Sequence, residues 1–222
     1  MSNVEAVIFG KRACFTMIQA NVERMTYPFI TPSSARAILE AILRKPEFRY
    51  EIKEIEVLNP IDYFSVKVNE VKGRMHSKER IFVNSTNQDK GRTQRNMTGL
   101  VDVAYLLKAE IILTEKGKKE KDSHGGENTP EKYMCIFNKR VEKGQSFHTP
   151  YFGFREFTAF FRPKTQEDKP ISANLIVPNM LYDVYDIWDL SKSVNDLKVS
   201  FFSAAMKSGV IKVPSWNEIK KF

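Results

Sequence analysis

A short helix whose two ends can be identified in the sequence places the strongest constraint on the fold. Thr31 can cap its N-terminus, and Pro32 suits the first helical position, where a missing N–H is no loss. Pro46 prevents the helix from continuing. We therefore predict a helix over residues 32–45. Its apolar side chains recur on one face, at Ala35, Ile38, Leu39 and Ile42.

The same signals predict a second helix over residues 131–143. Thr129 is a suitable N-cap, Pro130 follows it, and Gly144 ends the segment. One face of this helix carries Tyr133, Ile136, Phe137, Arg140 and Val141. Each helix lies between strand-like segments, which indicates a mixed α+β protein.

The strand-like segments complete a recognisable order of elements. Residues 48–58 alternate apolar and charged side chains with a period of two, which is typical of a half-buried strand. Without an insertion at 60–97, the order is strand, helix, strand, strand, helix, strand. We predict a ferredoxin-like or RRM-like βαββαβ antiparallel sheet with both helices on one face; two ferredoxin-like halves are an alternative. The other strands are expected at 4–15, 61–71, 79–83, 101–113 and 147–161, with 79–83 returning beside 61–71 as an inserted hairpin.

Composition divides the chain into a main domain at 1–162 and a small β-rich C-terminal part at 171–222. The segment between them, 162–170, is polar and reads as a linker. Residues 115–129 include a lysine-rich run without an apolar face, so a solvated, mobile loop is expected there. In the C-terminal part, short strands are expected at 197–202 and 209–213.

The balance of charge suggests a polyanionic partner. Of the 222 residues, 42% are hydrophobic and 28% charged, and the formal net charge is +8. A basic excess favours nucleic acid because neutralised phosphates release counterions, although a basic protein without such a partner is equally compatible. Cys14 and Cys135 form no paired motif and are expected to be reduced thiols. No membrane-spanning or signal segment is visible, so a cytoplasmic protein is expected.

Several enzyme classes lack their usual sequence signatures here. The sequence contains no phosphate-binding loop, dinucleotide fingerprint, zinc-protease motif or nucleophile elbow. Its three histidines are far apart and its carboxylates are scattered, so neither a metal site nor another cofactor is expected. Metal-free RNA cleavage remains, in which the 2′-hydroxyl attacks the adjacent phosphate with help from Lys, Tyr, His or Arg.

The candidate catalytic residues are Lys132, Tyr133 and His148. Lys132 and Tyr133 lie in the first turn of the second helix, where backbone N–H groups favour a phosphate. His148 follows that helix and is the best candidate for proton transfer near neutral pH. The alternatives are a core tyrosine and a hydrogen-bonded turn histidine.

Candidate RNA-binding residues are arginines and one aromatic side chain. Arginine suits bidentate pairing with phosphate, and aromatic rings can stack on bases, although aromatic residues in strands more often belong to the core. These candidates are Arg92, Arg95, Arg140, Arg155 and Tyr151.

Long phrases of this sequence resemble one family, the CRISPR repeat-processing endoribonuclease of subtype I-C, a member of the RAMP superfamily. The resemblance implies an RRM-like fold and metal-independent cleavage of precursor CRISPR RNA beside the repeat hairpin. It also implies that the protein stays on the 5′ handle of the guide, with the backbone and large subunits of the interference complex as partners. The phrases that carry it lie at 27–46, 92–96, 102–105, 137–145 and 147–157.

The family's catalytic residues are only partly present. One branch of the family has a tyrosine late in the first helix and a Lys-His pair at the start of the second. The corresponding positions here are Leu43 and Lys132-Tyr133. Two interpretations follow: a repeat-specific endoribonuclease, with Tyr133 or His148 in the rebuilt site, or a non-catalytic RNA-binding subunit with non-specific affinity for duplex DNA.

Overall fold

The computed structural model describes residues 3–20, 22–71, 92–119, 121, 125–184 and 199–219. Within these ranges one sheet of nine strands has the order β6-β1-β5-β3-β9-β8-β7, and β2 and β4 also pair with β5. The bounds of the strands are β1 Asn3–Ala13, β2 Arg24–Met25, β3 Phe48–Val57, β4 Asp62–Val71, β5 Arg92–Leu113, β6 Phe160–Arg162, β7 Leu175–Asp183, β8 Ser200–Lys207 and β9 Val210–Lys212. The bounds of the helices are α1 Pro32–Ile42, α2 Glu115–Lys119, α3 Pro130–Glu142 and α4 Trp216–Ile219.

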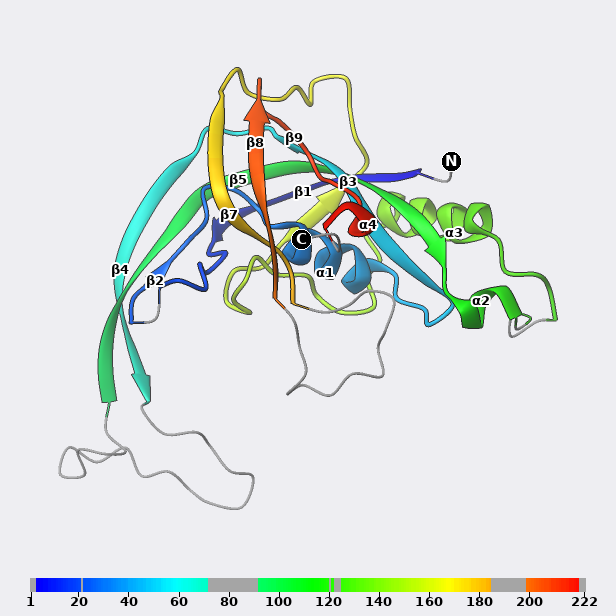
Figure 1. Cartoon of the computed structure of the whole chain (residues 1–222), viewed down its shortest axis with the longest axis horizontal. Coiled ribbons are helices and arrows are strands. Elements are labelled where there is room, and N and C mark those ends of the chain that lie inside the picture. The colour runs from blue at the N-terminus through cyan, green and yellow to red at the C-terminus, as the bar shows by residue number, and fades with distance from the viewer. Residues whose placement is uncertain are drawn as a thin grey trace, which may run out of the picture.

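The centre of the sheet is formed by β1, β5 and β3, which pair antiparallel. Alternate residues of β1 face the core, where Val4, Ala6 and Ile8 are almost completely buried. At 22 residues, β5 is longer than the predicted 101–113, and its first half pairs with β4. These two strands form a ribbon that extends away from the rest of the sheet (Figure 1).

Both predicted long helices are present, each capped as expected. The hydroxyl of Thr31 accepts a hydrogen bond from the Ser34 N–H at 3.2 Å, and that of Thr129 accepts one from the Lys132 N–H at 3.3 Å. The apolar face of α1 is buried as predicted, whereas the helix ends at Ile42 rather than at residue 45. In α3 the buried residues are Tyr133, Phe137 and Val141.

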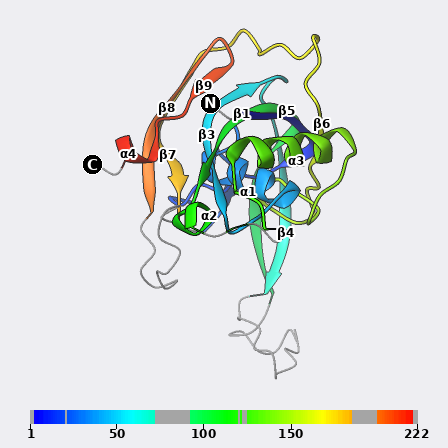
Figure 2. The same ribbon diagram turned by 90° about the vertical axis from the view of Figure 1, so that its right-hand side faces the viewer.

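The two helices lie next to each other on the same face of the sheet (Figure 2). Tyr50 of β3 connects them: its hydroxyl donates to the Leu43 carbonyl after α1, and its ring lies 5.9 Å from that of Phe137 in α3. Burial raises the pKa of Tyr50 far above its ordinary value, so this hydroxyl remains protonated. The prediction of an antiparallel α+β fold is confirmed.

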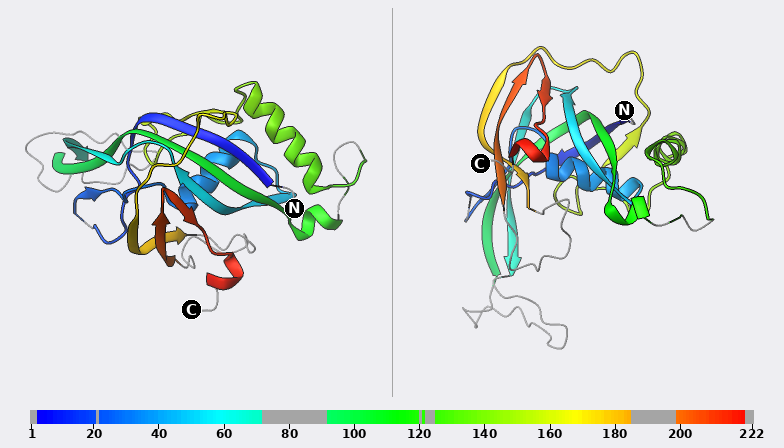
Figure 3. Two further views of the ribbon diagram at one scale, coloured as in Figure 1. Left: turned by 90° about the horizontal axis from the view of Figure 1, so that it is seen from above. Right: turned by 45° about the vertical axis from the view of Figure 1, so that its right-hand side comes forward.

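The C-terminal strands continue the same sheet. Ile211 of β9 pairs with Ile55 of β3, and β8 and β7 follow outward. The sheet curls so that β7 comes to lie alongside α1 (Figure 3). Arg36 of α1 donates to Asp183 of β7 at 2.9 Å, which connects the two elements. The division at 162–171 into two domains stays a prediction.

Three predictions of local structure need correction. Residues 147–161 were expected to form strands, but apart from a bridge between Tyr151 and Thr158 they are bends and turns up to β6. The loop expected over 115–129 begins with a short helix, α2, over its first five residues, and Gly117 lies close against the Glu47 carbonyl; mobility of the segment stays a prediction. The partner of β4 is the start of β5, and the expected partner at 79–83 lies outside the described residues.

In the described ranges, each helix is too short or too polar to cross a membrane.

Candidate active site

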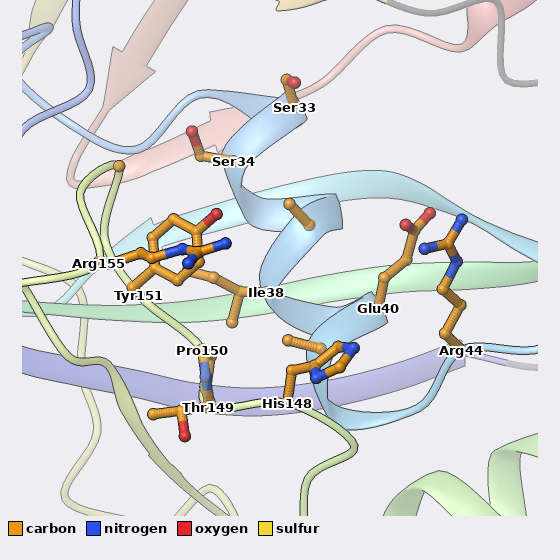
Figure 4. A pocket seen from close by; sticks show the side chains of 13 residues that line it. Ser33, Ser34, Ile38, Glu40, Arg44, His148, Thr149, Pro150, Tyr151 and Arg155 are labelled. Atoms are coloured by element: carbon orange, nitrogen blue, oxygen red, sulfur yellow. The ribbon is translucent and has the colours of Figure 1, made fainter. Parts of the chain in front are cut away.

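An open groove lies between the outer face of α1 and the segment 148–155 (Figure 4). Its volume is about 670 Å³. The side chains that line it include two arginines and one histidine, and four others carry hydroxyl groups. The residues that line it are Ser33, Ser34, Ala37, Ile38, Glu40, Ala41, Arg44, His148, Thr149, Pro150, Tyr151, Gly153 and Arg155.

The C-terminal end of α1 fixes one end of the 148–155 segment. The Ala41 carbonyl accepts from the N–H of Phe147 at 2.8 Å and from that of His148 at 3.0 Å. Arg140 of α3 donates to the next carbonyl, that of Ile42, at 2.6 Å. Because these carbonyls have no partner within the helix, the contacts both cap α1 and position His148 at the groove.

A buried aromatic residue fixes the other end. Phe152 is fully buried, and its carbonyl accepts from the Cys14 N–H at 3.1 Å. Its ring packs edge-on against those of Phe15 and Tyr105. The adjacent Tyr151 remains 43% exposed and lines the groove.

The groove carries more positive than negative groups. Arg44, Arg155 and His148 come from its two walls, and Glu40 is the acidic residue of the lining. The Glu40 carboxylate accepts from Arg36 at 2.8 Å, so part of its charge is balanced from outside the groove. Such a surface suits a phosphodiester, and a histidine beside two arginines can transfer protons next to a stabilised anion.

The structure brings together three of the eight predicted site residues: His148, Tyr151 and Arg155. Arg140 lies behind them as a cap of α1. Lys132 and Tyr133 lie at the start of α3 and are not among the residues that line the groove.

The surroundings of Tyr133 are those of a core residue. Tyr133 is 3% exposed, its hydroxyl donates to the Asn128 side chain at 2.5 Å, and its ring lies 4.6 Å from that of Phe48. The Lys132 ammonium lies 5.8 Å from the centre of the Tyr133 ring. Leu43, at the position of the family's tyrosine, is also buried. Catalytic roles for Lys132 and Tyr133 stay predictions.

The two remaining arginines belong to the β4–β5 ribbon. Arg95 forms an ion pair with Glu70 at 3.2 Å and donates to the Val22 carbonyl at the same distance. Arg92 begins β5 opposite Val71. Arg95 is not among the residues of the groove, and the RNA contacts of both arginines stay predictions.

The sequence reasoning missed the contribution of α1 to the groove. Ser33, Ala37 and Glu40 follow one another at spacings of four and three, so they share one face of α1, and Arg44 lies just after its end. This polar face was visible in the sequence. What the sequence did not show is that the 148–155 segment lies opposite it.

His, Cys, Asp and Glu side chains form no group of three or more suited to a metal ion in the part of the chain that the structure describes.

Comparisons with known proteins decide the family. A family model described as CRISPR-associated protein (Cas_Cas5), the Cas5d model, matches residues 4–214. The chain belongs to the Cas5d family. Two curated relatives bear the name CRISPR pre-crRNA endoribonuclease Cas5d. The Thermus thermophilus protein is 37% identical, covering 97% of this chain and 93% of its own. The Mannheimia succiniciproducens protein is 36% identical, covering 96% of each. The family resemblance seen in the sequence is confirmed.

Solved structures show the same fold as this Cas5d chain. A CRISPR-associated protein matches 98% of the chain, with 94% of its own length covered, a TM-score of 0.67 and 22% identity. A functionally uncharacterized protein from Streptococcus mutans matches 98% of the chain, with 95% of its own length covered, a TM-score of 0.66 and 22% identity.

Proposed function

We propose that this chain is a CRISPR pre-crRNA endoribonuclease that binds the repeat hairpin and cuts the RNA without a metal ion. Family membership supports the activity, since both curated relatives bear that name and align with this chain over nearly their full length. The observation that supports a particular site is the groove, which His148, Arg44 and Arg155 line together.

The groove supplies the groups that 2′-hydroxyl attack requires. His148 takes a proton from the attacking 2′-hydroxyl or gives one to the departing 5′-oxygen. Arg44 and Arg155 stabilise the additional negative charge on the phosphorane. Tyr151 stacks on a base beside the cut. Because DNA has no 2′-hydroxyl, this chemistry is specific for RNA.

The proposed scaffold is an RRM-like βαββαβ domain over residues 1–162, followed by the β-rich part at 171–222. The order β6-β1-β5-β3, with α1 between β1 and β3 and α3 between β5 and β6, supports it. In this arrangement the groove lies on the helical side of the sheet.

The proposal includes the partners of the cut product. The protein remains on the 5′ handle of the guide and joins the backbone and large subunits of the subtype I-C interference complex. A net charge of +8 favours the RNA and gives incidental affinity for duplex DNA.

The test uses the purified protein, a synthetic repeat RNA and EDTA. We expect cleavage in EDTA and none when the sugar at the cut is 2′-deoxy. His148→Ala is expected to slow cleavage about a hundredfold or more without weakening RNA binding, the usual scale for losing an acid–base group. Gln145→Ala, an exposed neighbour, is the matched control.

Lys132→Ala decides between the groove and the start of α3. A large rate loss in Lys132→Ala with none in His148→Ala would place the reaction at α3, as the family's Lys-His pair suggests. A parent protein that binds the repeat tightly and never cuts it would support the second candidate function, an RNA-binding structural subunit.

A further inference from the structure

Two neighbouring phenylalanines lie exposed at one edge of the sheet. Phe9 of β1 pairs with Phe160 of β6, and their ring centres are 5.8 Å apart with an angle of 31° between the planes. Phe9 is 38% exposed and Phe160 55%. Large apolar side chains usually avoid water, so an exposed aromatic pair indicates a contact surface.

The pair faces away from the core. Residue Ile8, next to Phe9, is fully buried, and side chains alternate along a strand. Phe9 therefore points to the face of the sheet opposite the helices. Lys11, two residues further along β1, lies on the same face and is exposed. Its neighbours Gly10 and Arg12 pair with Val103 and Val101 of β5, so Asp102 lies near it in the ladder.

The pair is also close to the groove along the chain. Thr158 bridges Tyr151 in the groove wall, and the Ala159 N–H donates to the Pro150 carbonyl at 3.0 Å. Phe160 is the next residue. The edge of the sheet that carries Phe160 and Phe9 therefore lies next to the groove wall at Tyr151.

From these observations we infer that Phe9 and Phe160 form a stacking site for unpaired bases of the RNA that flank the repeat hairpin. The inference rests on the proposed function and adds a second contact to it. Aromatic side chains on an exposed sheet are a sequence-tolerant surface for single-stranded RNA, because every base has a face that can stack. Lys11 is placed to contact the backbone of the same strand.

The test compares two synthetic repeat RNAs by fluorescence anisotropy. One has the hairpin with its single-stranded flanks, and the other has the hairpin alone. Deoxyribose in the flanks and at the base of the stem prevents cleavage and keeps the bases. Phe9→Ala and Phe160→Ala are expected to weaken binding of the flanked RNA about five- to a hundredfold. Binding of the bare hairpin should stay unchanged, and Phe160→Trp should bind the flanked RNA like the parent.

Tyr63→Ala is the matched control, since Tyr63 is 52% exposed on β4. Unchanged binding of the flanked RNA in both phenylalanine variants would overturn the inference, as would an equal loss with both RNAs. It would also be overturned if the variants bound RNA normally and failed only to join other subunits of the complex. A parent that stacks flanking bases and never cuts would refute the endoribonuclease alone. If the parent cuts the RNA and both phenylalanine variants bind the flanked RNA as tightly as the parent, only the stacking site would be refuted.

Discussion

At the scale of single residues, Tyr133 is a candidate catalyst that has the surroundings of a core residue. Its hydroxyl reaches the buried Asn128 side chain, and its ring is covered by Phe48. Tyr133→Phe removes this donor and leaves a buried acceptor with one partner fewer. We expect the free energy of unfolding to fall by about 1–2 kcal/mol while cleavage continues at the parent rate.

Denaturant unfolding and single-turnover cleavage of the repeat RNA measure these two effects. Tyr151→Phe, at an exposed position, should leave stability unchanged. A hundredfold slower cut by Tyr133→Phe at parent stability would instead assign proton transfer to this hydroxyl.

Gly153 is the residue on which the groove wall depends most closely. Its φ is +83°, and a Cβ at this position would lie 1.9 Å from the Cys14 carbonyl oxygen. Gly153→Ala should therefore lower the free energy of unfolding by about 3 kcal/mol or more, because both the backbone and its neighbour must move.

Gly144 provides the matched control for that change. Its φ is +62°, but a Cβ there would meet no atom within 4 Å. Gly144→Ala is expected to cost only about 1–2 kcal/mol, for the left-handed backbone alone. Similar losses in the two variants, measured by thermal unfolding, would show that the Cys14 contact is unimportant.

At the scale of elements, the connection between β6 and β7 is held by an ion pair. Arg162 donates to both carboxylate oxygens of Asp168 at 2.6 and 2.7 Å, and the Thr165 N–H donates to one of them. These hydrogen bonds hold the pKa of Asp168 well below its usual range, and the one from Arg162 has the largest effect. The stabilisation is present above the unfolded-state pKa of about 4 and is lost as the pH falls through the lower folded-state value.

Asp168→Asn should therefore lower the free energy of unfolding at neutral pH by about 0.5–1 kcal/mol, a modest amount because Arg162 is partly exposed. Between about pH 4 and 2, its stability should fall less steeply than that of the parent. Urea unfolding at a series of pH values, with Glu167→Gln as the control, measures the slope. Parallel curves for parent and variant would contradict the assignment.

Elements with strong local signals were predictable from the sequence. The helix starts at Thr31 and Thr129 depend on a capping side chain and a proline, which act within one turn. The segment 147–161 was predicted as strands because it is rich in aromatic residues. Its turns are instead held by tertiary contacts, such as those of Phe152 with Phe15 and Tyr105, which the local sequence does not reveal. Only one wall of the groove could be predicted from the sequence. The residues of the α1 wall recur at helical spacing, whereas the opposite wall is positioned by tertiary hydrogen bonds to the end of α1.

At the scale of the whole molecule, the net charge of +8 should make RNA binding strongly dependent on salt. Arg155→Ala and Arg44→Ala are each expected to reduce the slope of log affinity against log salt by about one unit, for one lost phosphate contact. Arg95→Ala should change it less, because Glu70 already pairs with that guanidinium.

Filter binding of the uncleavable repeat RNA at several salt concentrations measures these slopes, with Lys139→Ala, an exposed lysine of α3, as the control. An unchanged slope in both groove variants would remove Arg44 and Arg155 from the RNA interface.

The continuity of the sheet also determines the order in which the protein can be completed during synthesis. β3 forms early in the chain, but one of its edges pairs with β9, which is translated about 150 residues later. Pairing over such a sequence distance closes late, because chain entropy opposes it. Until β9 leaves the ribosome, the β3 edge has unpaired backbone groups and can join a strand of another nascent chain. Pairing with β9 thus protects the β3 edge from misassembly.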